Sequence, residues 1–234
     1  MPEPPLPPNQ QTPSSTATHI STPMDFTALP LFPLHTVLFP GGLLSLQIFE
    51  VRYLDLMKRC EKTGEPFGVV SLQSGHEVRR APRPGETETL APIGTLATLE
   101  RIEHPQPGLM LIQARGTQRF TLQSSHLLPH GLWTCAIQLI PDDIPAAVPA
   151  ELASFSQRLQ GTLTAMAGQD DTLPLPAPPD DPRWQDAGWL ANRWAECLPL
   201  PAAERQRLMS LDNPLWRLEL VTEWLERLGQ HPGP

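Results

Sequence analysis

The chain has 234 residues, 40% of them hydrophobic, with 25 acidic and 17 basic residues and a net charge of −8. It can bury one sizeable core, and its acidic balance argues against a general nucleic-acid binder, which needs a basic surface. Three widely spaced cysteines argue against a disulfide framework or a zinc site, and no apolar run reaches the roughly 18 residues of a membrane span. The N-terminus lacks a signal-peptide pattern, so a cytoplasmic protein without metal or cofactor is expected.

Prolines divide the chain, since 30 residues are proline, more than twice the average usage of about 5%. Seven fall in residues 1–24, which hold few large aliphatic side chains and are predicted to form a disordered tail. Five more fall between residues 174 and 182, and a disordered Pro/Asp-rich loop is predicted near 168–182. The others lie mostly at strand entrances, turns and helix starts, which are positions that tolerate proline.

Residues 25–141 show the short apolar runs that are typical of β-strands. The pair Gly116-Thr117 predicts a tight hairpin between two of them. Helical spacing interrupts the strands once, and the expected buried stripe of that helix is Val51, Leu54, Met57 and Cys60. The expected elements are strands over 29–34, 36–39, 43–49, 67–72, 93–103, 109–115, 119–123 and 133–140, a helix over 50–63, and an exposed loop over 75–92.

From residue 142 to 230 the apolar period becomes helical. Asn213 is expected to cap a last helix that begins at Pro214, and Pro201 is expected at the first position of the helix before it. Earlier helices are expected over 151–167, 183–198 and 201–211. Five of the six tryptophans lie in this part and predict a bundle core together with the apolar face of the last helix, which is Leu215, Leu218, Val221, Trp224, Leu225 and Leu228. Strands first and helices later predict an α+β fold with two subdomains.

Motifs for phosphate binding or hydrolysis are missing from the sequence. Its only lysines, Lys58 and Lys62, do not follow glycine, so no Walker A loop is present, and no Gly-x-Ser-x-Gly or His-Glu-x-x-His pattern occurs. A Ser–Lys dyad would have to use one of these two lysines, and both fall on the polar side of the helix predicted over 50–63. An ammonium in water keeps its proton near pH 7, so neither lysine fits a catalytic role. The sequence predicts a protein that is not an enzyme.

Three short patches carry the most specific signal. The first runs from residue 29 to 41 and is punctuated by prolines. The second is Leu-Gln-Ile-Phe-Glu-Val-Arg-Tyr over residues 46–53. The third is Gly-Thr-Gln-Arg-Phe over residues 116–120, preceded by Ile-Gly-Thr-Leu-Ala over 93–97.

Together and in this order, the patches resemble the N-terminal substrate-binding domain of Lon proteases, over roughly residues 27–229. The stretch from Asn192 to Leu200 is similar to the helical half of that domain. The resemblance implies a PUA-like β-barrel followed by a small helical bundle. It also implies binding of unfolded or extended protein segments, or of a partner protein, rather than cleavage. Lon proteases continue into ATPase and Ser–Lys protease modules whose motifs this sequence lacks, so a stand-alone, non-catalytic domain is expected.

Glu50 is expected in the first turn of its helix, where the helix dipole favours a carboxylate by about 0.3–1 kcal/mol, with Arg52 and Arg119 as its candidate ion-pair partners. Tyr53 is expected to pack its ring on the barrel. Three phenylalanines, Phe32, Phe39 and Phe49, are expected in the core. The resemblance marks eight positions as structural or binding residues: Pro33, Pro40, Phe49, Glu50, Arg52, Tyr53, Gly116 and Arg119.

Three functions are compatible with these features. The preferred one is a protein-binding module that holds extended segments, for example by strand addition at a barrel edge. The second is an RNA-binding PUA-like domain, which the local basic run of Arg79, Arg80 and Arg83 favours and the net charge opposes. The third is a small hydrolase with dispersed catalytic residues.

Overall fold

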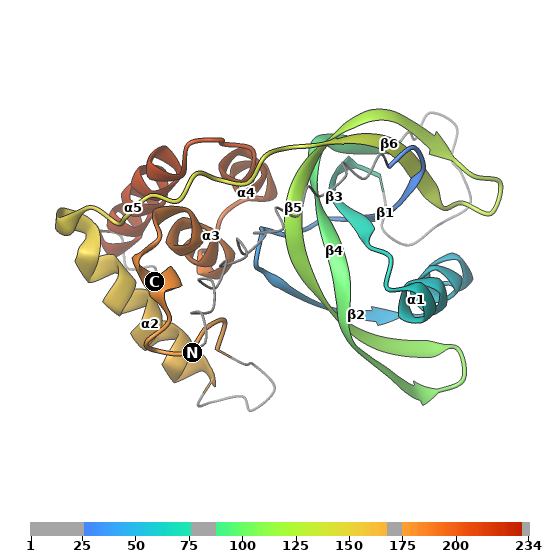
Figure 1. The fold of residues 1–234 in the computed structure, drawn as a ribbon, viewed down its shortest axis with the longest axis horizontal. Coiled ribbons are helices and arrows are strands. Elements are labelled where there is room, and N and C mark those ends of the chain that lie inside the picture. The colour runs from blue at the N-terminus through green and yellow to red at the C-terminus, as the bar shows by residue number, and fades with distance from the viewer. Residues whose placement is uncertain (1–25, 76–87, 168–174, 231–234) are drawn as a thin grey trace, which may run out of the picture.

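The β-rich and helical parts of the sequence form the two halves of the computed structural model, with strands β1–β6 and helix α1 in one half and helices α2–α5 in the other (Figure 1). The structure describes residues 26–75, 88–167 and 175–230. The fold is α+β, as the order of strands and helices predicts. The predicted tail over 1–24, the basic run of Arg79 to Arg83 and residues 168–174 of the predicted loop lie outside the described residues.

The six described strands form one mixed sheet in the order β2-β5-β4-β3-β1-β6. β6 also pairs with β5, so five strands close into a ring, and the expected β-barrel is present. Closure depends on the length of β5, because its first half pairs with β2 and its second half with β6 along the same edge. The strands are β1 (Leu29–Leu34), β2 (Leu43–Ile48), β3 (Phe67–Ser74), β4 (Thr89–Gln106), β5 (Leu109–Leu127) and β6 (Trp133–Leu139).

The hairpin predicted at Gly116-Thr117 is wrong. β5 runs through Gly116 without a break, and the chain turns instead at Gly108, whose φ of 80° lies in the left-handed region that glycine favours. The strand predicted over 36–39 is also absent. Val37 and Phe39 leave the barrel there and pack into the apolar core of the helical half. β4 begins at Thr89, inside the loop predicted over 75–92.

Helix α1 (Val51–Thr63) ends at Gly64, whose φ of 72° stops the helix. Leu54, Met57 and Cys60 are buried as predicted, but Val51 is 71% exposed. A strict three-residue repeat drifts by about 60° per step around a helix, because three residues fall short of one full turn. The first member of the stripe has therefore rotated away from the buried face.

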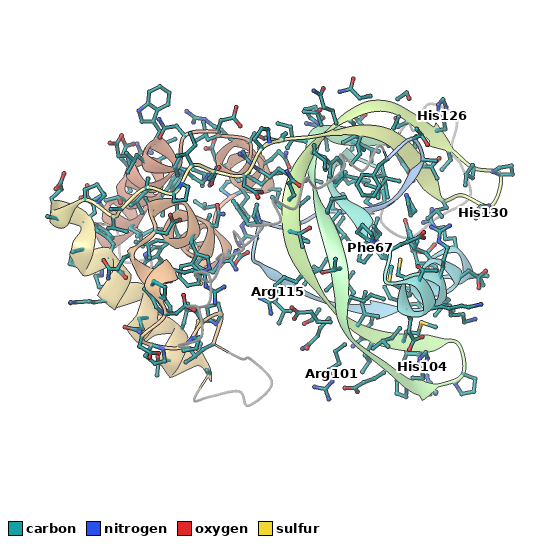
Figure 2. The ribbon with its side chains drawn as sticks, in the orientation of Figure 1. Phe67, Arg101, His104, Arg115, His126 and His130 are labelled. Atoms are coloured by element: carbon teal, nitrogen blue, oxygen red, sulfur yellow. The ribbon has the colours of Figure 1, made fainter. Side chains whose placement is uncertain are left out.

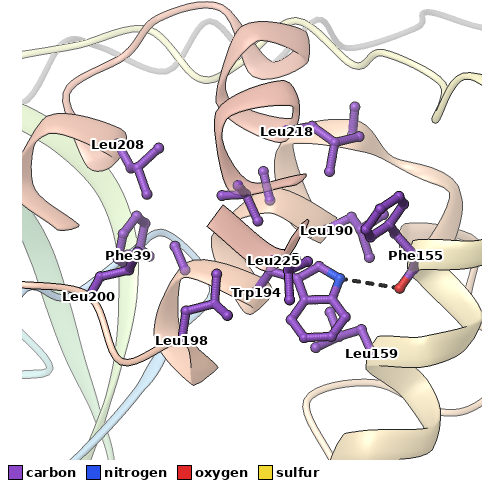
Figure 3. Packing of buried hydrophobic residues seen from close by; sticks show 14 of the residues in the cluster. Phe39, Phe155, Leu159, Leu190, Trp194, Leu198, Leu200, Leu208, Leu218 and Leu225 are labelled. Carbon is purple, nitrogen blue, oxygen red and sulfur yellow. Dashed lines mark hydrogen bonds between the residues drawn. The ribbon is translucent and has the colours of Figure 1, made fainter. Parts of the chain in front are cut away.

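The barrel interior is apolar and contains Phe67, which is fully buried (Figure 2). A separate apolar cluster fills the helical half, where the Trp194 indole donates a hydrogen bond to the Phe155 carbonyl oxygen at 3.2 Å (Figure 3). Phe39 reaches this cluster from the barrel side, so one continuous stretch of chain ties the two halves together. The helical elements are η1 (Ala150–Leu152), α2 (Ala153–Ala167), η2 (Pro182–Gln185), α3 (Ala187–Cys197), α4 (Ala202–Met209) and α5 (Pro214–Gln230).

Most of the expected bundle core is found. Trp184 and Trp194 are buried, whereas Trp216 is 63% exposed at the start of α5. Asn213 caps α5 as predicted, because its Oδ1 accepts hydrogen bonds from the backbone N–H groups of the second and third helical residues. Pro201 stands one position earlier than predicted, as the N-cap of α4. On α5, Leu218, Val221 and Leu225 are buried, while Leu215 and Leu228 are exposed.

Residues 175–182 are the part of the predicted Pro/Asp-rich loop that the structure describes. Ala177 is buried there, and the Pro178 carbonyl accepts a hydrogen bond from the Trp184 indole at 2.7 Å. The Pro179 carbonyl accepts another from Gln160 of α2. These two hydrogen bonds connect this segment to α2 and η2.

Candidate functional site

Pro40 and Gly116, two of the eight family-motif positions, meet at a tight turn beside β5. The Gly41 N–H donates to the Gly116 carbonyl at 2.8 Å, and the Gly116 N–H donates to the Gly42 carbonyl at 2.9 Å. A Cβ at position 116 would collide with the carbonyl oxygen of Phe39, so only glycine fits. The pair is structural, because it fastens the stretch that carries Phe39 into the helical half.

Two arginines, one from each half of the molecule, donate hydrogen bonds to the same turn. Arg115 of β5, labelled in Figure 2, donates to the Gly41 carbonyl at 3.0 Å, and Arg193 of α3 donates to the Pro40 carbonyl at 2.9 Å. Arg193 also forms an ion pair with Glu196 at 2.9 Å. Burial raises the pKa of Glu196 to about 7, although Arg193 and Arg115 act in the opposite direction. The sequence does not mark Arg193 and Glu196 as a pair, because a three-residue spacing of opposite charges on a helix is common.

Arg119 is buried where the barrel meets the helices, and the predicted pairing with Glu50 is wrong. Its guanidinium donates to the carbonyls of Met209 and Leu211, and it pairs with Asp143 at 3.0 Å. Arg217 of α5 reaches the same Asp143 carboxylate at 2.5 Å. Burial lowers the pKa of Arg119, and Asp143 opposes that shift. Arg119 is therefore a junction residue whose donors are occupied within the protein.

Glu50 and Arg52 form the expected ion pair, with 3.0 Å between Arg52 Nη2 and Glu50 Oε2. Arg52 also donates to the Gly131 carbonyl between β5 and β6, so the pair fixes α1 to the barrel. Glu50 is the N-cap of α1 rather than a first-turn residue, and its side chain makes no cap hydrogen bond. Tyr53 stacks on Phe32 with 4.0 Å between ring centroids, which confirms that its ring packs on the barrel.

Pro33 is buried within β1, opposite Val70 of β3. Its place lies beyond Leu29–Leu31, the stretch of β1 that pairs with β6. A proline, which has no N–H to donate, is tolerated best where a ladder is incomplete. Pro33 is thus part of the barrel wall and not of an exposed surface.

Phe49 is the exception among the eight positions, because its side chain is 57% exposed although a core position was predicted. Successive strand residues point to opposite faces, so the burial of Ile48 at the end of β2 turns Phe49 outward. Val51, two residues on, is exposed as well. We call Ser45, Gln47, Phe49 and Val51, the exposed side chains along β2 and just after it, the β2-edge surface.

Two further features adjoin the β2-edge surface. β2 pairs with β5 along one edge, and along the other edge it pairs with no strand among the described residues. A hollow of about 90 Å³ lies between β2 and the end of β1, and it is lined by Phe32, Leu34, Leu46, Gln47, Ile48, Phe49, Glu50 and Tyr53. Unpaired backbone groups, an apolar hollow and exposed apolar side chains can hold another chain by noncovalent contact.

Side chains suited to chemistry do not gather at this surface. Within the described ranges, no group of three His, Cys, Asp or Glu side chains is placed to hold a metal ion. Lys58 and Lys62 lie on the exposed side of α1, as expected. No helix in the part of the chain that the structure describes has both the length and the hydropathy that crossing a membrane requires.

Comparisons with known proteins show the family and the fold of this chain. Residues 28–227 match the family model of the ATP-dependent protease La (LON) substrate-binding domain. The crystal structure of a Lon N-terminal domain protein from Xanthomonas campestris is 31% identical, covers 85% of this chain and 98% of that one, and has a TM-score of 0.64. The N-terminal domain of the Mycobacterium avium complex Lon protease is 14% identical over 86% of this chain and 98% of its own, with a TM-score of 0.54, and shows the shared fold alone.

A curated relative is longer than this chain. It is a LON peptidase N-terminal domain and RING finger protein of Schizosaccharomyces pombe, 25% identical over 224 residues. The match covers 86% of this chain but 46% of the relative, so the chain spans about half of that protein.

Proposed function

Because the chain belongs to the family of ATP-dependent protease La (LON) substrate-binding domains, we propose that it is a non-catalytic module that binds extended or unfolded protein segments at the β2-edge surface. The family description names binding of a substrate and not its cleavage. The exposed positions of Lys58 and Lys62 support a non-catalytic role, because a catalytic lysine needs a desolvated site.

One observation carries the proposal. Phe49 and Val51 are 57% and 71% exposed next to a strand edge that no described strand covers. Exposed apolar side chains beside an unpaired strand edge are suited to contact with an added chain. Covering the exposed part of each side chain contributes about 1–2 kcal/mol, which is enough for weak, reversible capture of non-native segments. Phe49 is the exposed member of the eight family-motif positions, which supports the β2-edge surface as the place where this motif meets a partner.

The test compares three forms of the protein. Fluorescein-labelled lactalbumin, kept unfolded by reduction and carboxymethylation, is titrated with wild type, with the double variant Phe49→Ser/Val51→Ser, and with Trp216→Ser. The last is a matched control, because Trp216 is 63% exposed but lies on α5 in the helical half. We expect the anisotropy titration to show at least tenfold weaker binding for the double variant and no change for the control. Equal binding by all three forms would refute the assignment to this surface.

A further inference from the structure

The hydrogen-bond phase of β2 determines which of its backbone groups face the unpaired edge. In an antiparallel pair, residues that exchange hydrogen bonds alternate with residues that do not. Gly116 donates its N–H to the Gly42 carbonyl, and the register then places Leu44, Leu46 and Ile48 in the hydrogen-bonded positions. Ser45 and Gln47 therefore direct their N–H and C=O groups away from β5, toward the second edge.

The second edge of β2 lacks the features that usually protect a strand edge. Edge strands are commonly blocked by lysine, proline or an inward-pointing charge. β2 has the sequence Leu-Leu-Ser-Leu-Gln-Ile and contains none of these. Glu50, the carboxylate that lines the hollow, is paired with Arg52. The edge is thus uncharged and open to a further strand, and the net charge of −8 disfavours acidic segments as its occupant.

The hollow lies at that edge, because inward residues of β2 and the outward Gln47 and Phe49 all line it. Leu46 and Ile48 point inward and line the hollow, together with Phe32 and Leu34 of β1. In an added strand, a residue opposite Leu46 would point to the same face and enter the hollow. Its volume of about 90 Å³ suits one aliphatic side chain.

We infer that the occupant is an extended, non-acidic segment that adds as a strand to β2. In this complex it exchanges backbone hydrogen bonds with Ser45 and Gln47, inserts one aliphatic side chain into the hollow, and covers Phe49 with its outward face. The inference rests on the proposed function and specifies its binding mode and substrate class.

A proline substitution separates backbone from side-chain contributions. Gln47→Pro removes the outward N–H and leaves the bonds of Leu46 and Ile48 to β5 in place, which is the arrangement in which edge strands tolerate proline. Gln47→Ala removes only the side chain. With the labelled, unfolded lactalbumin, we expect at least tenfold weaker binding for Gln47→Pro than for Gln47→Ala, and wild-type binding for the latter. Equal affinities of two folded variants would overturn the inference.

Amide hydrogen exchange on the wild-type protein tests strand addition without a substitution. The Leu46 and Ile48 amides should be protected with and without unlabelled carboxymethylated lactalbumin. The Ser45 and Gln47 amides should exchange quickly in the free protein and at least tenfold more slowly in the complex. Unchanged exchange at Ser45 and Gln47 at saturation would overturn strand addition, even if Gln47→Pro failed to fold.

The inference of strand addition can be wrong while the proposed function is right, and these experiments distinguish the two cases. If Phe49→Ser/Val51→Ser loses binding but the Ser45 and Gln47 amides stay unprotected, the surface binds through side chains alone, and only the inference is wrong. A second copy of the chain is the competing occupant of the edge. A wild-type dimer in sedimentation equilibrium without lactalbumin, abolished by Gln47→Pro, would assign the edge to self-association and would also overturn the inference.

Discussion

Arg119 and Phe49 both lie in the sequence patches that resemble the Lon substrate-binding domain, yet one is buried and the other is exposed. Arg119 is 4% exposed, and its donors are occupied by Met209, Leu211 and Asp143. Phe49 is 57% exposed beside a strand edge that no described strand pairs with. One region holds the two halves of the molecule together, and the other presents apolar and backbone groups outward. Resemblance to a family therefore marks positions without separating buried, internally bonded residues from exposed ones, whereas the structure does separate them.

The largest expected effect is at the junction. Asp143→Ala leaves Arg119 and Arg217 buried without their shared carboxylate, and an uncompensated buried charge costs about 3–5 kcal/mol. Urea unfolding should show this loss in the free energy of unfolding. Asp212→Ala is the matched control, because Asp212 also lies near Arg119, at 3.4 Å, but its side chain is 83% exposed. The control should lose less than about 1 kcal/mol, and a similar loss in both variants would contradict a buried junction.

Gly116→Ala should produce the next largest effect. The new methyl group meets the backbone carbonyl of Phe39, which cannot move without disturbing the turn, and overpacking of this kind costs about 2–3 kcal/mol. Thermal and urea unfolding measure the loss. Gly161→Ala on α2, where nothing lies within 4 Å, should instead stabilise the protein by about 0.5–1 kcal/mol. A neutral Gly116→Ala would show that the turn is not tightly packed.

Glu196 gives a smaller, pH-dependent effect. Its pKa is raised from 4.5 to about 7 by burial, so the folded protein holds this proton more tightly than the unfolded chain does. The resulting stabilisation is present below about pH 4.5 and is lost as the pH rises through 7. Between pH 5 and pH 8, wild type should lose about 1–2 kcal/mol more than Glu196→Gln, as measured by urea unfolding at each pH. If both proteins lost the same free energy of unfolding over this range, the ion pair with Arg193 would outweigh the effect of burial on the pKa of Glu196.

The smallest effect on stability is expected at Phe49, although this residue is proposed to contribute strongly to binding. Phe49→Ser should change the free energy of unfolding by no more than about 0.5 kcal/mol, because the side chain is mostly in water already. Urea unfolding beside wild type is the measurement. A loss above 2 kcal/mol would make Phe49 a core residue after all and remove the contrast with Arg119.

Local pattern was a good guide to β1, to most of α1 and to the start of α5. The bounds of β1, the buried stripe of α1 after its first turn and the Asn213 cap all follow from short-range rules. The closed barrel was expected from the resemblance and not from the pattern. Closure depends on the length of β5, which the sequence conceals because Gly116 resembles a turn residue.

The candidate site was harder to predict, because it depends on contacts between distant residues. Asp143 lies in a connection without periodicity, so nothing local marks it as the partner of Arg119. Gly116 is required by the approach of Phe39, a contact between β5 and the segment that precedes β2 and not a local turn. The exposure of Phe49 could have been foreseen, since strict alternation from the buried Leu44 and Ile48 places it outward.

Site-specific photo-crosslinking tests the central claim most directly. Benzoylphenylalanine is placed at position 49 or, as a control, at position 216, and each protein is irradiated with labelled, unfolded lactalbumin. The account predicts a strong crosslinked product from position 49 and little from position 216, although both positions are well exposed. Equal yields at the two positions, or a product from position 216 alone, would contradict the assignment of binding to the β2-edge surface.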